Sequence, residues 1–311
     1  MTDIALTLNA RAELATIIRR FFAARNVLEV TTPVLSQHAV TDPAIDSFLI
    51  DDQPRRYLRT SPEYAMKRLL CSGAPDIFEL GPVFRAGESG RRHNPEFTLL
   101  EWYRHDFTMH ELITEVVDLL AECAVPGAAE DPVILTYRDL FLRELGIDID
   151  VVDNTTLSRL AHDEGLQGNG PFERQELLDM LFASRLQTTL QPTDVAVITH
   201  YPKAQAALAK LDPVNPGYAL RFEVFIRGVE IANGFEELRD AVEQRERFAT
   251  DNHRRLARGQ PEVTVDERFL TALASGLPAC SGVALGFERL LMVTAGFASI
   301  DQAMTFSWPL A

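Results

Sequence analysis

The sequence has few cysteines, no long apolar run and too little positive charge to balance its acids. Its three cysteines, Cys71, Cys123 and Cys280, are odd in number and widely spaced, which is typical of buried thiols in a reducing compartment rather than of a disulfide or zinc site. No apolar stretch approaches the roughly 18 residues that a membrane-spanning helix needs, and the N-terminus lacks a signal or transit pattern. We therefore expect a cytoplasmic protein with no membrane partner.

The charge balance is acidic, with 45 Asp and Glu residues against 30 Lys and Arg and a formal net charge of −15. Nucleic-acid binders draw much of their affinity from clustered basic residues that neutralise phosphates. The densest basic cluster, Arg254, Arg255 and Arg258, lies among acidic neighbours in a predicted helix, so we expect it on a solvated helix face. The composition disfavours a large tRNA footprint.

The chain can bury a substantial core, because 46% of its 311 residues are hydrophobic. We find no internal repeat and no linker long enough to separate two units, so we expect one α+β domain over residues 1–311. Hydrophobic periodicity predicts helices over 10–25, 61–71 with Ser61 as N-cap, 108–124 and about 237–258. It predicts strands over 78–84, 96–104, 194–200, 221–226 and 229–234, and an extended segment that ends at Pro33.

The first predicted hairpin joins 78–84 to 96–104 through a polar loop that opens after Arg85. Because side chains alternate along a strand, one face carries Phe97, Leu99, Glu101 and Tyr103, and the other carries Thr98, Leu100, Trp102 and Arg104. The first face mixes an aromatic ring, a carboxylate and a phenol, which indicates a pocket; a half-exposed sheet face is the alternative. The Arg85 guanidinium can reach an α-phosphate and stabilise charge that develops at phosphorus.

The second predicted hairpin places two glutamates together. With a two-residue turn at 227–228, Ile226 pairs with Val229 and Phe225 with Glu230. The predicted face is made of Glu223, Phe225, Glu230 and Ala232. Two carboxylates this close require a cation, and Mg²⁺ held with triphosphate oxygens meets that demand. Two solvent-facing glutamates on an edge hairpin are the alternative.

The third pattern, SGVALGFERLL at 281–291, ends a strand and starts a helix. Gly282 and Gly286 permit close backbone approach. Arg289 lies in the first turn of the helix, where its guanidinium can contact an adenine or a γ-phosphate.

In this order, with a helix-strand-proline unit at 10–33 ahead of them, the patterns resemble motifs 1, 2 and 3 of the class II aminoacyl-tRNA synthetases. HNPEFTLLEWY at 93–103 and VEIANGFEEL at 229–238 are similar to the lysine-specific branch. The resemblance covers nearly the whole chain and is weakest around 125–195. It implies a class II catalytic core with a mainly antiparallel sheet flanked by helices, a homodimer formed through motif 1, and the use of ATP and Mg²⁺.

Matched residue by residue, the resemblance implies that Arg85 and Arg289 are catalytic. It implies an ATP site made of Arg85, His93, Asn94, Phe97, Glu223, Glu230, Ile231, Gly286 and Arg289, with Glu223 and Glu230 as Mg²⁺ ligands. It implies a substrate site made of Ser61, Glu63, Glu101, Tyr103, Asn233, Glu237 and Ala284. In that site Glu101, Tyr103 and Glu237 would bind the distal ammonium, Glu63 the α-amino region and Asn233 the carboxylate.

Lysyl-tRNA synthetases carry an N-terminal OB-fold anticodon domain before motif 1, whereas the motif 1 helix here begins near residue 10. With SPEYAMKRLL at 61–70 and CSGVALG at 280–286, this resembles the free-standing paralogues that ligate lysine to elongation factor P. Their resemblance implies activation of (R)-β-lysine or lysine and transfer to a lysine ε-amine of elongation factor P, without tRNA. Ala284 stands where the tRNA enzymes are expected to have glycine, which would reshape the pocket for the β-amino isomer.

One departure and two alternatives stay open. The family usually has Asn-Glu after the motif 2 arginine, but here Ala86 and Gly87 follow, and the acid is Glu88. The alternatives are a truncated synthetase-like enzyme acting on tRNA or a small amine, and a non-catalytic regulator that binds an amino acid. Such regulators tend to lose the motif 2 or motif 3 arginine, and this chain keeps both. No residue announces itself as the base for the acceptor amine.

Overall fold

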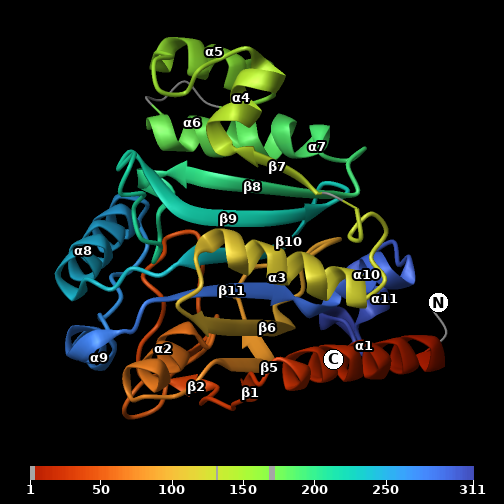
Figure 1. Ribbon diagram of the computed structural model, residues 1–311. Helices are drawn as coiled ribbons and strands as arrows, with labels where there is room; N and C mark the ends of the chain where they lie inside the picture. Colours follow the sequence, from red (N-terminus) through yellow and green to blue (C-terminus); the bar gives the residue numbers. More distant parts are fainter. Residues whose placement is uncertain (1–3, 131, 168–171) are drawn as a thin grey trace.

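A large sheet forms the centre of the computed structural model, which describes residues 4–130, 132–167 and 172–311 (Figure 1). The strands pair antiparallel except at the two edges, where β1 runs parallel to β5 and β7 runs parallel to β8. In sheet order the strands are β1 Leu28–Glu29, β5 Ile77–Phe84, β6 Glu96–His105, β11 Cys280–Gly286, β10 Val229–Glu236, β9 Tyr218–Ile226, β8 Val195–Pro202 and β7 Val133–Thr136. The predicted α+β class with a mainly antiparallel sheet is confirmed.

A small sheet and a set of helices complete the fold. The small sheet has the order β2-β4-β3, with β2 Leu35–Ser36, β3 Leu49–Ile50 and β4 Arg56–Leu58. The helices are α1 Ile4–Ala24, α2 Glu63–Cys71, α3 Met109–Glu122, α4 Tyr137–Leu145, α5 Asn154–Asp163, α6 Arg174–Leu181, α7 Gln187–Thr189, α8 Ala241–Ala257, α9 Glu267–Gly276, α10 Phe287–Ala295 and α11 Ile300–Ala303. A π-helical turn at Phe182–Leu186 joins α6 to α7, and 3-10 turns occupy Lys203–Gln205 and Trp308–Leu310. Among the helices of the described ranges, none has the length and apolar character required to cross a membrane.

Two helices begin later than the sequence predicts. Helix α8 begins at Ala241 rather than near 237, because the Asp240 carboxylate accepts hydrogen bonds from the backbone N–H groups of Val242 and Glu243. Helix α2 begins at Glu63, with Pro62 rather than Ser61 in the N-cap position. Both predicted starts were wrong. A side chain that accepts hydrogen bonds from the N–H groups of the first turn marks the point where extended backbone ends and the helix begins. Residues 237–240 therefore precede α8 and continue the chain from β10.

One face of the large sheet is covered by α1, α3 and α10 and forms the main core. Trp102 of β6 is fully buried there. Its neighbour Phe22 of α1 stacks on Phe78 of β5 with ring centroids 4.6 Å apart. The alternation predicted for β6 is confirmed on this side, because Leu100 and Trp102 lie in the core.

The other face is covered only at its two ends. Helices α4 to α7 pack over β7 and β8, around a buried cluster that includes Tyr137 and Phe225. Helices α2 and α9 pack against the β5 and β6 end, around Tyr103 and Ile77. Between these two groups of helices, the middle strands present polar side chains to a cleft.

The turn between β9 and β10 follows the predicted register at first. Val229 pairs with Ile226 and Glu230 with Phe225. The register then shifts, so that the agreement extends over these two pairs only.

A β-bulge between Glu230 and Ala232 causes the shift. Beyond it Ala232 pairs with Val224, and Asn233 pairs with Glu223. Ala232 is 2% exposed and lies in the main core with Ile231, so the prediction that Ala232 shares a face with Glu223 was wrong. The extra residue of a bulge turns the strand, and here it brings Asn233 to the position expected for Ala232.

The three cysteines are free thiols, as expected. Cys123 and Cys280 are buried, whereas Cys71 is half-buried.

Candidate active site

A row of four side-chain positions crosses the uncovered stretch of the sheet. Glu101 of β6 pairs with Ala284 of β11, Ala284 pairs with Asn233 of β10, and Asn233 pairs with Glu223 of β9. All four line a cleft of about 670 Å³ that α2, α6 and α8 also border. Because directly paired residues point to the same face, the row brings together residues that are far apart in the sequence.

A parallel row lies one step along the strands. Tyr103 pairs with Gly282, Gly282 with Phe235, and Phe235 with Arg221. A Cβ atom at Gly282 would clash with the Tyr103 ring and would lie 2.6 Å from Glu237 Oε1. Glycine at 282 therefore gives the phenol and the carboxylate the space that they occupy.

We call the part of the cleft formed by Ser61, Glu63, Glu101, Tyr103 and Glu237 the acidic end. Glu101 is 2% exposed. Its two oxygens accept hydrogen bonds from Ser61 Oγ and Tyr103 Oη, each at 2.7 Å. Burial, followed by the nearby Glu63 charge, raises the pKa of Glu101 to about 7. The structure thus places all five of these predicted substrate residues in one region.

Lys67 belongs to the same region but was missed in the sequence. Its Nζ lies 2.6 Å from Glu63 Oε1 and 2.5 Å from Glu237 Oε2, and its side chain is 1% exposed. The available signal was its place in α2, between the apolar residues Met66 and Leu70, both of which are buried. A lysine on the buried face of a helix requires a carboxylate partner.

Arg289 forms a second centre, which we call the arginine centre, with His93, Glu230 and Arg85. Its Nη1 donates to the Glu230 backbone carbonyl at 2.9 Å and lies 3.4 Å from Glu230 Oε2. Its Nη2 lies 2.7 Å from His93 Nε2. A guanidinium only donates hydrogen bonds, so His93 accepts at Nε2 and is neutral in this contact. Burial, followed by the Arg289 charge, lowers the pKa of His93, which agrees with that state.

Arg85 is the member of the arginine centre that also lines the cleft. Its guanidinium lies 5.1 Å from the centre of the half-buried Phe97 ring. Its Nη1 is 3.8 Å from Glu88 Oε1, so the acid of the unusual motif 2 loop faces the motif 2 arginine. Besides burial, the Arg289 charge and, to a smaller extent, the Arg85 charge lower the pKa of His93.

Three other predicted ATP residues are placed differently. Asn94 is 5% exposed, and its amide bonds the Glu96 carbonyl and the Trp308 N–H. The Ile231 side chain lies in the main core, on the far side of the sheet from the cleft. A Cβ at Gly286 would make only ordinary contact, 3.6 Å from Arg289 Cδ. Any contact of Ile231 with a ligand would therefore use its backbone.

Glu223 and Glu230 are the predicted metal ligands. Glu223 is 8% exposed, and its oxygens are held by Arg221 Nη2 at 2.5 Å and Tyr201 Oη at 2.7 Å. Burial raises the pKa of Glu223, Arg221 opposes this, and the Glu230 charge adds to it. The two carboxylates therefore interact. No cluster of three or more metal-ligating side chains occurs in the described ranges. A pair of carboxylates suits Mg²⁺ that takes its remaining ligands from phosphates and water.

The prediction of a solvated face was wrong for Arg255 of the basic cluster near the end of α8, whereas Arg258, just after this helix, is exposed. Arg255 is 4% exposed, and its guanidinium bonds the Asp42 and Pro261 carbonyls and lies 3.3 Å from Asp46 Oδ1. Arg254 and Arg258 border the cleft. The sequence analysis made no prediction for segment 41–46. The contacts of Arg255 hold this segment beside the cleft.

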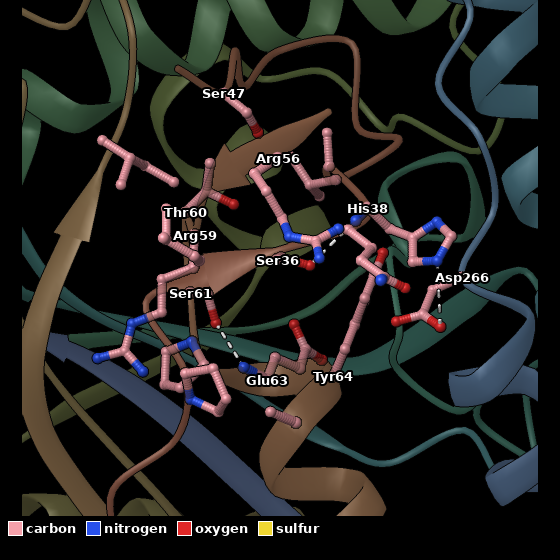
Figure 2. A pocket seen from close by; sticks show the side chains of 18 of the residues that line it. Ser36, His38, Ser47, Arg56, Arg59, Thr60, Ser61, Glu63, Tyr64 and Asp266 are labelled. Carbon is pink, nitrogen blue, oxygen red and sulfur yellow. Dashed lines mark hydrogen bonds and ion pairs between the residues drawn. The ribbon is translucent and has the colours of Figure 1, made fainter. Parts of the chain in front are cut away.

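A second cavity of about 330 Å³ lies behind Ser61 and Glu63 (Figure 2). Figure 2 shows Arg56 and His38 on one side of this cavity, and Ser61 and Glu63 on the other. The Glu63 backbone N–H donates to Ser61 Oγ at 3.0 Å. Ser61 and Glu63 therefore separate the two cavities, and Ser61 both orients Glu101 and receives the first N–H group of α2.

Comparison with known proteins places this geometry in a family context. The family model for class II tRNA synthetases (D, K and N) matches residues 2–308. The chain is 46% identical over 305 residues to the elongation factor P--(R)-beta-lysine ligase of Proteus mirabilis, covering 95% of this chain and 93% of the relative. It is 44% identical over 306 residues to the ligase of the same name from Pectobacterium atrosepticum, covering 96% and 93%. For the ligase of that name from Histophilus somni, the identity is 42% over 305 residues, covering 96% and 94%.

Proposed function

The chain belongs to the class II tRNA synthetase family (D, K and N), and from this premise we propose that it ligates (R)-β-lysine to elongation factor P. The reaction is ATP-dependent. The observation that carries the proposal is one cleft whose wall contains the buried carboxylates of Glu101 and Glu237 together with the Arg85 guanidinium, while Arg289 lies beside His93 and Glu230. The two substrates have charges complementary to these groups: the diamino acid carries two ammonium groups and a carboxylate, and ATP carries negative phosphates.

In the first step, a carboxylate oxygen of the amino acid attacks the α-phosphorus of ATP, and the bond to pyrophosphate breaks. Arg85 and Arg289 hold the nucleotide and offset the negative charge that develops in the transition state. Glu223 and Glu230 would hold Mg²⁺, which would supply further positive charge to the triphosphate when bound. The product is an aminoacyl adenylate.

In the second step, a lysine ε-amine of elongation factor P attacks the carbonyl carbon of the adenylate. AMP leaves, an amide bond forms, and the amine loses its proton. The amine must be deprotonated to attack, because its unperturbed pKa is about 10.4.

The acidic end selects the amino acid. Glu101, Tyr103 and Glu237 bind the distal ammonium, Glu63 the other amine and Asn233 the carboxylate. Carboxylates buried without a cation are costly, so a substrate that lacks the distal amine is rejected. Ala284 borders the cleft between Glu101 and Asn233 and shapes the space near the amine that differs between the α- and β-isomers.

We further propose that residues 1–311 act as one catalytic domain, that the protein is a cytoplasmic homodimer, and that the acceptor is a protein rather than tRNA. The net charge of −15 supports the last point, because a large phosphate footprint requires basic residues. Exposed leucines on β1, β2 and β3 support a homodimer.

ATP–pyrophosphate exchange tests the first step. We expect exchange with (R)-β-lysine above L-lysine and little with ornithine. Arg289→Ala should lower kcat/KM by about a hundredfold or more, as for loss of a group that stabilises transition-state charge. The control is Arg227→Ala, at the exposed turn of the β9–β10 hairpin, where the arginine pairs with Asp194. If none of the amino acids supports exchange, the result would favour a non-catalytic regulator.

The mass of elongation factor P after incubation tests the second step. We expect a mass increase equal to one aminoacyl group, at a lysine, and no charging of tRNA. Charging of tRNA or of a small amine with elongation factor P unchanged would instead identify a truncated synthetase-like enzyme.

A further inference from the structure

Lys67 forms a buried ion triad with Glu63 and Glu237. Its Nζ lies 2.6 Å from one oxygen of Glu63 and 2.5 Å from one oxygen of Glu237. The exposed fractions of the three side chains are 1% for Lys67, 19% for Glu63 and 1% for Glu237. The triad joins α2 to the end of β10, which come from distant parts of the sequence.

Lys67 stands behind the two carboxylates and not in the wall of the cleft. Glu63, Glu101 and Glu237 all border the cleft, whereas Lys67 is absent from the described residues that do so. A bound amino acid would touch the glutamates and would not touch the lysine. Any effect of Lys67 on the substrate must therefore act through the positions and charges of Glu63 and Glu237.

The charges of the acidic end can be counted from these contacts. When all three are ionised, the carboxylates of Glu63, Glu101 and Glu237 carry three negative charges, and the Lys67 ammonium offsets one. Glu101 is oriented by the neutral hydroxyls of Ser61 and Tyr103. The acidic end therefore keeps two uncompensated negative charges, which equals the number of amines in a diamino acid.

We propose that Lys67 is a positioning and specificity-determining residue that fixes the two carboxylates and sets the acidic end to receive two ammonium groups. This inference rests on the proposed function, because it concerns the amino-acid site of that reaction. Without Lys67, three carboxylates would face a substrate with two amines, and one carboxylate would have to take up a proton or lose its place. Charge at a buried site without a partner is the costlier state.

The protonation of the neighbouring groups agrees with this arrangement. Burial disfavours the charged Lys67, but Glu237 and Glu63 outweigh it and raise the pKa of this lysine, so it stays charged. Burial raises the pKa of Glu237 to about 8, and the Lys67 charge opposes that rise. The other titratable groups nearby are Tyr64 and Cys71 of α2, Tyr103 of β6 and Cys280 of β11, and burial raises the pKa of each, so they stay neutral.

The test is amino-acid-dependent ATP–pyrophosphate exchange as a function of pH, with (R)-β-lysine and Lys67→Gln. Glutamine keeps hydrogen-bond donors and removes the charge. We expect the KM for the amino acid to rise by about tenfold or more, with the KM for ATP unchanged. The pH below which this KM rises should move upward, because Lys67 no longer opposes protonation of Glu237 and Glu101.

Two further variants complete the design. Lys210→Gln is the matched control: Lys210 Nζ lies 2.5 Å from Glu236 Oε1, next to Glu237 on β10, but its side chain is 44% exposed. It should leave both KM values and the pH profile unchanged. Lys67→Arg keeps the charge in a larger, planar group, so it should keep the wild-type pH profile while the displaced carboxylates raise the amino-acid KM.

The outcomes are distinguishable from failure of the proposed function. Wild type without lysine-type exchange would overturn that function itself. Active wild type with an unchanged amino-acid KM or pH profile in Lys67→Gln would overturn the charge-setting role. If Lys67→Gln does not fold by circular dichroism, Lys67→Arg decides: a raised amino-acid KM supports the positioning role, and a wild-type KM overturns it.

Discussion

Glu101 illustrates how burial changes the properties of an ordinary carboxylate. Its two oxygens are oriented by Ser61 and Tyr103, and its side chain has almost no access to solvent. A buried carboxylate gains much from an ammonium partner and loses much without one. The same burial makes its protonation sensitive to pH in the neutral range.

At the residue scale we predict that the KM for the amino acid rises as the pH falls. The pKa of Glu101 is raised to about 7 and that of Glu237 to about 8 in the ligand-free protein. Below these values the groups are protonated and no longer attract an ammonium, whereas above them both are charged. The rise follows from linkage and approaches about tenfold per pH unit for each group well below its pKa.

Glu101→Gln separates the contributions of Glu101 and Glu237 to the pH dependence of this KM. The variant should have a higher amino-acid KM at pH 8. Its log KM should fall with pH less steeply, by one titrating group, when exchange is measured between pH 6 and pH 9. Glu96→Gln, at the exposed start of the same strand, should retain the wild-type profile. An unchanged profile in Glu101→Gln would contradict the assignment.

At the scale of elements, two local features position the site. The bulge between Glu230 and Ala232 turns β10 so that Asn233 faces the cleft opposite Glu223. The Asp240 cap starts α8 after the chain has left the sheet, which leaves Glu237 free to meet Lys67. Helix α8 then runs beside the cleft and contacts segment 41–46 through Arg255.

We predict that Arg255→Ala loosens segment 41–46 and lowers stability. The substitution leaves the Asp42 and Pro261 carbonyls without a buried donor, which costs about 1–3 kcal/mol in the free energy of unfolding. Urea unfolding measures the loss, and hydrogen exchange at 41–46 should become faster. The amino-acid KM should also rise, because this segment borders the cleft.

Arg245→Ala on the same helix is the control. Arg245 pairs with Glu267 at 2.6 Å, but both side chains are more than half exposed, so its loss should change the free energy of unfolding by less than about 1 kcal/mol. Equal effects of the two substitutions would show that Arg255 is no more than a surface arginine.

At the scale of the whole molecule, the two faces of the sheet have separate tasks. One face packs against α1, α3 and α10 and supplies the main core. The other leaves its middle strands open, so that polar side chains line a cleft. In this acidic chain Arg92 lies near the arginine centre and donates to the Gly228 carbonyl. Burial, then the Arg91 charge and the Arg289 charge, lower the pKa of Arg92.

We predict that the protein is a homodimer whose interface includes exposed leucines near the β1 edge. Leu28 is 53% exposed, Leu35 is 51% and Leu49 is 50%, and burial of these side chains against a second copy of the chain would be favourable. Leu35→Glu with Leu49→Glu should yield a monomer in sedimentation velocity.

Val214→Glu is the control for that experiment, because Val214 is 90% exposed in a loop away from this region. It should leave the sedimentation coefficient unchanged. A monomeric wild type, or a double variant that sediments as wild type does, would contradict the interface.

Much of the site could be predicted because part of its geometry is local. The alternation of side chains along β6 is a property of any strand, so Glu101 and Tyr103 could be assigned to one face from their spacing alone. A two-residue turn likewise determines the first pairs of a hairpin, and Glu230 does lie opposite Phe225. Motif order and residue identity also predicted Arg85 and Arg289 as parts of one site.

The rest depended on contacts between distant segments. Local alternation predicts Ala232 beside Glu223, but the bulge that replaces it with Asn233 forms because Ile231 and Ala232 both pack into the core. Nothing in 61–70 alone distinguishes Lys67 from an exposed lysine. Its burial arises where α2 meets Glu237 at the end of β10. The sequence by itself therefore determined the fold class, the family and most strands of the large sheet, whereas the tertiary structure decided which charges are paired, because pairing follows from burial and proximity.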